Sequence, residues 1–76
     1  MYKPNEFNHP RAIAIAEASE DASAAGDFDV ADRLAMAAVH QEEGDEGTAE
    51  LWLESVDFKV RQKIDRRVSA LNAVAV

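Results

Sequence analysis

The histidines are the first residues to test for chemistry, because their spacing can indicate a metal site. His40 and Glu43 stand three positions apart, a helical spacing at which an imidazole and a carboxylate can share a metal ion. A transition-metal site needs three or four ligands, but the only other histidine is His9 and there is no cysteine. We therefore expect no metal site, and we interpret His40 as a surface residue near a helix C-terminus.

Hydroxyl groups and carboxylates are the other candidates for catalysis. A serine acts as a nucleophile only beside a general base, and no histidine forms a recognisable motif with any serine of the chain. The carboxylates have the spacing of solvent-facing helix positions, with no sign of a pair whose pKa values differ. The three glycines form no phosphate-binding loop. The sequence predicts no catalytic residue, no cofactor and no enzyme activity.

A basic cluster near the C-terminus could contact nucleic acid. Its members are Arg61, Lys63, Arg66 and Arg67, and four cations could bind phosphates. However, the pI of the chain is about 4.6, whereas nucleic-acid-binding domains are typically basic. The cluster also lacks the aromatic residues on which single-stranded bases stack. Direct nucleic-acid binding is therefore our third hypothesis.

The charges are distributed unevenly along the chain. Residues 1–57 carry fourteen acids and three bases, a net charge of −11, and residues 58–76 carry five bases and one acid, a net charge of +4. Such asymmetry favours antiparallel self-pairing or an oppositely charged partner, although a solvated acidic surface would look the same. An acidic decoy that mimics nucleic acid on a DNA- or RNA-binding protein is our second hypothesis.

The length and hydropathy of the chain limit its class. Its 76 residues allow a single domain over residues 1–76, of a size that is marginally stable alone. No segment approaches the ~18 consecutive apolar residues of a membrane span, and the N-terminal residues lack the apolar core of a signal peptide. We expect a cytoplasmic protein that gains stability from self-association or from a partner.

Apolar periodicity predicts an all-α fold. After an irregular segment at residues 1–8, spacings of three and four residues predict helices over about residues 9–25, 28–43 and 48–73. Glycines at positions 26, 44 and 47 mark the breaks between them. No segment alternates as a strand does. The predicted architecture is a three-helix unit, in which a helical hairpin precedes one long helix.

The length of the third predicted helix suggests a dimer. It would span ~39 Å, against ~24 Å for each helix of the hairpin, so its apolar stripe would continue where no other helix could cover it. Each large aliphatic side chain left in water would forgo ~1.5–3 kcal/mol. We therefore predict a homodimer, with an interface that contains Val60, Ile64, Val68 and Leu71.

A second apolar patch is predicted on the same helix. Leu51 and Phe58 are seven residues apart and lie nearly opposite the main stripe, with Trp52 on the flank between the two faces. Aromatic residues in such positions are enriched among binding anchors. Alternatively, the third helix could lie between the other two and bury both of its faces. We predict a partner-binding surface that contains Leu51, Trp52, Phe58 and Arg61.

One segment resembles a known helical motif. Gly26-Asp27-Phe28, followed by alanines at positions 31, 35 and 38, is similar to one tetratricopeptide-type hairpin over residues 15–38. The resemblance implies that the glycine turns the chain, that the aromatic packs across the helix pair and that the alanines allow close contact. The position 34 residues after the glycine is Val60, so the unit is not repeated. The resemblance is limited to local hairpin geometry.

The leading hypothesis combines these observations. In size, charge and helicity the chain resembles small acidic phage-encoded proteins that inactivate a host regulatory or defence protein. We expect a non-enzymatic protein–protein interaction module, an inhibitor or regulator that occludes its target. The target protein cannot be identified from the sequence.

Overall fold

Two glycine–aspartate turns of the same geometry organise the chain. The computed structural model describes residues 4–74. Gly26 and Gly44 have φ angles of 83° and 87°, in the left-handed region that glycine adopts without strain. The following Asp27 and Asp45 each donate their N–H to the carbonyl five residues back, at 2.8 and 2.9 Å. This is the Schellman ending of a helix, and in each case it reverses the chain.

The described chain consists of helices joined by short turns. A short 3₁₀ turn, η1 (Pro4–Glu6), precedes α1 (Pro10–Ala24), α2 (Phe28–Glu42), α3 (Glu46–Leu53) and α4 (Phe58–Val74). No residue between 4 and 74 is in a strand, so the predicted all-α class is confirmed. The predicted bounds of the first two helices agree with α1 and α2 to within one residue.

The single helix predicted over residues 48–73 is wrong, because the chain bends at residues 54–57. The N–H of Val56 donates to the carbonyl of Leu53 at 3.0 Å and closes the last turn of α3. Asp57 then caps α4 by accepting the N–H of Lys59 on Oδ1 at 2.8 Å, which satisfies a free amide of the new helix. Val56 is only 5% exposed, so the apolar stripe is not interrupted at the bend. For this reason the spacing of apolar residues gave no sign that the helix ends there.

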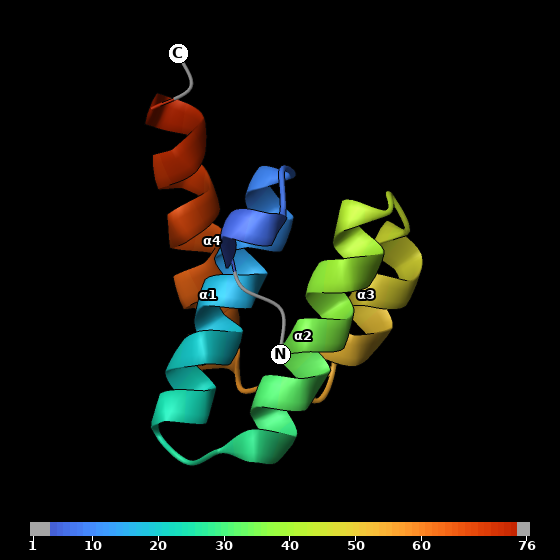
Figure 1. Cartoon of the computed structure of the whole chain (residues 1–76), viewed down its shortest axis with the longest axis vertical. Coiled ribbons are helices and arrows are strands. Elements are labelled where there is room, and N and C mark those ends of the chain that lie inside the picture. Colours follow the sequence, from blue (N-terminus) through green and yellow to red (C-terminus); the bar gives the residue numbers. More distant parts are fainter. Residues whose placement is uncertain (1–3, 75–76) are drawn as a thin grey trace.

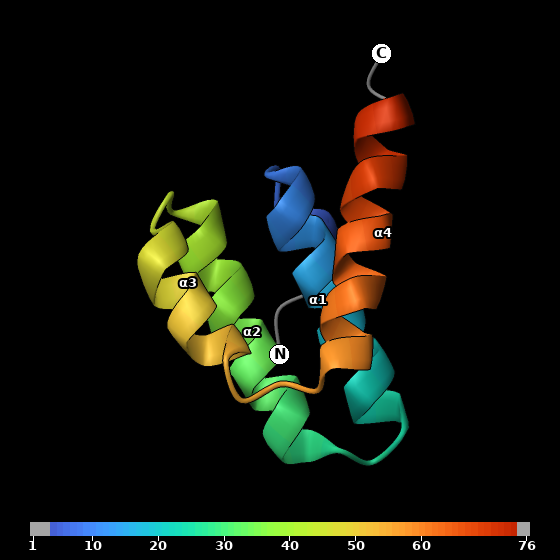
Figure 2. The same ribbon diagram turned by 180° about the vertical axis from the view of Figure 1, so that it is seen from behind.

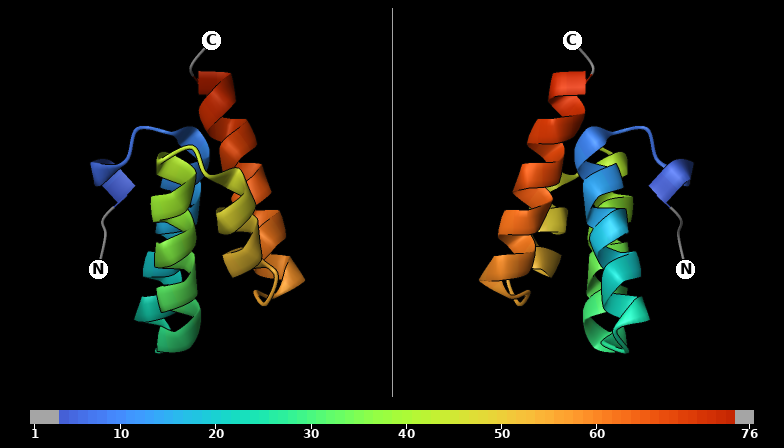
Figure 3. Two further views of the ribbon diagram at one scale, coloured as in Figure 1. Left: turned by 90° about the vertical axis from the view of Figure 1, so that its right-hand side faces the viewer. Right: turned by 90° about the vertical axis from the view of Figure 1, so that its left-hand side faces the viewer.

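The four helices form two layers, which Figure 3 shows edge-on. The α1–α2 hairpin is one layer; in the other, α3 packs on α2 and α4 packs on α1, as Figures 1 and 2 show from opposite sides. At one end the α1–α2 turn projects beyond the α3–α4 linker, and at the other end α4 extends beyond the hairpin. None of these helices has both the length and the apolar character needed to cross a membrane.

Small side chains dominate the core. Eight of the fourteen buried apolar residues are alanines, which let helices approach closely but remove little apolar area from water. The largest fully buried apolar side chains are Ile15, Leu34, Leu53 and Ile64. The hydroxyl of Ser19 is also buried and donates to the carbonyl of Ala31 at 2.7 Å. The α1–α2 contact therefore combines close packing with one buried hydrogen bond.

The bend also changes what covers the apolar stripe. Ile64 is 1% exposed, and Val60, Val68 and Leu71 pack partly against the same core. Because α4 folds back on α1, Ile64 is a core residue of the single chain and needs no second copy to cover it. Of the four residues predicted for the dimer interface, Ile64 is thus buried and the other three are partly buried, and self-association stays a prediction.

Candidate protein-binding surface

Four exposed apolar side chains lie near one end of the bundle. Phe58, Leu51 and Phe28 are 71%, 65% and 63% exposed, and Trp52 is 37% exposed. Phe28 begins α2, Phe58 begins α4, and Leu51 and Trp52 belong to the last turn of α3. Figures 1 and 2 show these three helix ends at the same end of the molecule. We refer to the four residues as the aromatic end.

Leu51, Trp52 and Phe58 were expected on the surface of one helix, but the structure places them on two helices. Leu51 and Phe58 were predicted to share one face of a continuous helix; they lie instead on separate helices, on either side of the α3–α4 linker. Phe28 was missed, because the hairpin resemblance implies that it packs across the helix pair, and its exposure contradicts that implication. Its position could have indicated the exposure: Phe28 directly follows the turn at Gly26, and at such a turn no neighbouring helix continues to cover a side chain.

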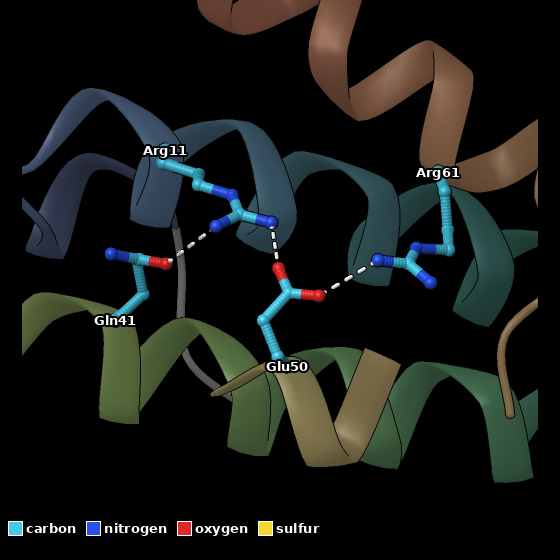
Figure 4. Close-up of polar contacts among 4 residues, drawn as sticks. All are labelled: Arg11, Gln41, Glu50 and Arg61. Atoms are coloured by element: carbon cyan, nitrogen blue, oxygen red, sulfur yellow. Dashed lines mark hydrogen bonds and ion pairs between the residues drawn. The ribbon is translucent and has the colours of Figure 1, made fainter. Parts of the chain in front are cut away.

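Arg61 belongs to a polar cluster between the layers and not to the aromatic end (Figure 4). Its Nη2 donates to Oε2 of Glu50 at 2.8 Å, while Oε1 of the same carboxylate accepts from Nη2 of Arg11. Nη1 of Arg11 also donates to Oε1 of Gln41 at 3.3 Å. One carboxylate on α3 thereby joins α1 and α4. The partner-binding role predicted for Arg61 has to compete with this internal ion pair.

The two arginines of this cluster stabilise the ionised form of the Glu50 carboxylate. The hydrogen bond from Arg11, with a smaller contribution from Arg61, holds the pKa of Glu50 below its ordinary value of 4.5. Gln41 is fully buried, and its Nε2 has no acceptor within residues 4–74. A buried polar group without a partner is costly. The two arginine–carboxylate contacts are the charge-assisted hydrogen bonds that can offset this cost.

A second carboxylate ties α4 to α1. Oδ2 of Asp21 accepts from Nη2 of Arg67 at 2.8 Å and from Nζ of Lys63 at 3.2 Å. The hydrogen bond from Arg67 is the largest of the effects that hold the pKa of Asp21 below its ordinary value of 3.8. Both cations come from α4, so Asp21 stays ionised against a helix that supplies its counter-charges.

These contacts occupy most of the basic cluster that could have bound phosphate. Arg61, Lys63 and Arg67 all pair with carboxylates of α1 or α3. Within the described residues, Arg66 is the one member of the cluster without an ion pair. The opposite charges of the two halves of the chain thus hold its own layers together, and a phosphate would have to displace these carboxylates.

The histidines have structural contacts. His9 caps α1, since its Nδ1 accepts the N–H of the residue two positions later, and its own N–H donates to Oε1 of Glu42 at 2.8 Å. Nδ1 of His40 lies 3.8 Å from Oε1 of Glu43. In the described part of the chain, no group of three or more histidine, aspartate or glutamate side chains is placed to hold a metal ion.

Comparison with known proteins gives no relative from which a function could be transferred. No protein-family model, no curated protein sequence and no solved structure matches the chain. The likeness to a tetratricopeptide-type hairpin stays a prediction, and of its three alanines Ala31 and Ala38 are buried. A functional assignment has to come from the exposed apolar residues and the charges.

Proposed function

We propose that this chain is a protein-binding module that covers a surface of its target with the aromatic end, and so inhibits or regulates that target. One observation supports the proposal most: within residues 4–74, eight of the fourteen buried apolar residues are alanines, whereas Phe28, Leu51 and Phe58 are each more than 60% exposed. Burial of one such side chain is worth ~1.5–3 kcal/mol, and small domains have only about 5 kcal/mol of stability. Leaving Phe28, Leu51 and Phe58 in water is costly unless a partner covers them.

The aromatic end is also held on fixed elements. Val56 anchors the α3–α4 linker in the core, and Asp57 caps α4 directly before Phe58. Trp52 is more than half buried, which restricts its orientation. Rigid aromatic anchors lose little conformational entropy on binding. This arrangement favours a preformed contact surface rather than one that orders only in the complex.

Capture of partners from native cells tests the proposal. The wild-type chain is compared with the Leu51→Ser/Phe58→Ser variant and with Met36→Ser, a control in the middle of α2 where the side chain is 38% exposed. We expect the double variant to lose a protein that the wild type and the control retain. Its stability should change by no more than about 0.5 kcal/mol per substitution, as at exposed sites. Retention of the same protein by the double variant would refute the proposal.

An acidic decoy for a nucleic-acid-binding protein is the second candidate. It is favoured by Asp27, Asp29 and Asp32, which are exposed and form no ion pair among residues 4–74. Binding through these carboxylates would weaken steeply as salt is added, because exposed charges are screened, whereas binding through the aromatic end would change little. A salt series on the captured complex therefore separates the two functions.

A further inference from the structure

The tip of the α1–α2 hairpin contains an apolar pocket that the second layer leaves open. A cavity of about 230 Å³ lies between the end of α1, the start of α2 and the start of α4. Its apolar walls are Ala18, Ala22, Ala25, Val30 and Val60. The pocket is accessible because the hairpin tip projects beyond the α3–α4 linker (Figure 3). A helix placed beyond that linker would continue the second layer over these walls.

The volume of the pocket suits apolar side chains. A dry cavity of about 150 Å³ holds benzene, whereas pockets for small-molecule ligands are commonly ~300–1,000 Å³. The pocket can therefore take a side chain the size of leucine or phenylalanine. Such a side chain would cover wall atoms that otherwise face water, which is the main driving force for association of this kind.

The charge around the pocket favours a cationic occupant. Three charged side chains line the pocket, namely Asp21, Asp27 and Lys63. Lys63 and Arg67 both reach a single one of these carboxylates, Asp21. Asp27 lines the pocket, makes no side-chain capping hydrogen bond and forms no ion pair within residues 4–74. A cation beside an apolar anchor would find an available carboxylate there.

We propose that this pocket binds a basic amphipathic helix of the partner protein, with an apolar side chain in the pocket and a lysine or arginine one turn away on Asp27. The inference rests on the proposed function, since it describes how a partner would be held beside the aromatic end. Helices that bind apolar grooves use anchors at such spacings. A nucleic acid is disfavoured as the occupant, because its phosphates would meet the carboxylates of the hairpin tip.

Two synthetic amphipathic helical peptides provide the probe. They share the same leucine positions, and their polar positions are all lysine in one peptide and all glutamate in the other. Nuclear magnetic resonance titration should show the lysine peptide shifting the amide signals of Ala22, Val30 and Val60. Ala25→Leu should fill the pocket and weaken binding about tenfold or more, as expected for loss of one apolar anchor. Ala25 is exposed, so this variant should fold; Ala22→Leu repeats the test from another wall.

A pair of charge variants tests the role of Asp27. Asp27→Asn should weaken binding of the lysine peptide severalfold, while Glu46→Gln, the same charge change at the start of α3, should not. Equal binding of the glutamate peptide, unchanged affinity of both pocket-filling variants, or equal effects of the two charge variants would overturn the inference. If Ala25→Leu still captures a native partner that Leu51→Ser/Phe58→Ser loses, the inference fails and the proposed function stands. If the wild-type chain captures no partner, the proposed function fails first.

Discussion

The contact within the α1–α2 hairpin and the contact between α4 and the hairpin depend on different forces. Within the hairpin, α1 and α2 meet mainly through buried alanines and the Ser19 hydrogen bond. One carboxylate, that of Glu42, also accepts the N–H of His9 at the start of α1, but most of the contact depends on shape. By contrast, α4 joins α1 through the stripe around Ile64 and through the ion pairs of Asp21 and Glu50. Ion pairs respond to pH and salt. We therefore expect the hairpin to tolerate changes of solution that loosen α4.

Ile64→Ala should have the largest effect on this comparison. Truncation of a fully buried isoleucine costs about 2–5 kcal/mol, and Ile64 is the one side chain of α4 in the buried core of the described chain. Urea unfolding should show this loss, and hydrogen exchange should show α4 losing protection before α1 and α2. Val68→Ala, at a partly buried position, is the control with a smaller loss. Equal loss of protection in all helices would mean that the layers unfold as one unit.

Gly26→Ala and Gly44→Ala should each cost about 1–2 kcal/mol, the penalty for a left-handed backbone at a residue with a Cβ. No atom lies within 4 Å of a Cβ built at either position, so the cost comes from the backbone alone and should be equal. Gly47→Ala is the matched control, since Gly47 lies within α3 without a positive φ and alanine favours a helix there. Thermal melts measure all three. A loss at Gly47 as large as at the turns would contradict this interpretation.

Glu50→Gln should have the smallest effect, about 1 kcal/mol at neutral pH, because the carboxylate is partly exposed and screened. The folded pKa of Glu50 is lowered, so its contribution is complete above the ordinary value of 4.5 and is lost as the pH falls through the lowered value. The stability difference between variant and wild type should thus shrink as the pH falls below 4.5 and through the lowered pKa of Glu50. A stability difference that is independent of pH would exclude an ionic origin.

The hairpin could be predicted from the sequence because its determinants are local. The alanine-rich faces repeat at the helical period, and Gly26 and Gly44 stop each helix with a backbone conformation that depends on few neighbours. The start of α4 could not be predicted in this way. Residues 48–74 contain no proline and no glycine, and Asp57, which caps α4, is also acceptable inside a helix.

The candidate surface was predictable only in part. Leu51 and Phe58 do not fit the apolar stripe, so their exposure follows from periodicity alone. Phe28 fits the apolar face of α2 by spacing, and only the end of the hairpin leaves it exposed. The contact of Arg61 with Glu50 could not be predicted, because Glu50 lies eleven residues away and reaches Arg61 only after the chain has bent.

The amino-acid order settles the helical class, the two turns and which residues avoid the apolar stripe, since each depends on neighbours within a turn or two of helix. Only the packed fold decides that α4 returns to α1, that Ile64 is buried and that the exposed aromatic residues gather at one end. These outcomes depend on contacts between residues far apart in the chain. Repeating apolar spacing is compatible with one long helix or with two. The chain adopts two helices because this arrangement buries more of the apolar stripe and pairs the cations of α4 with carboxylates of α1 and α3.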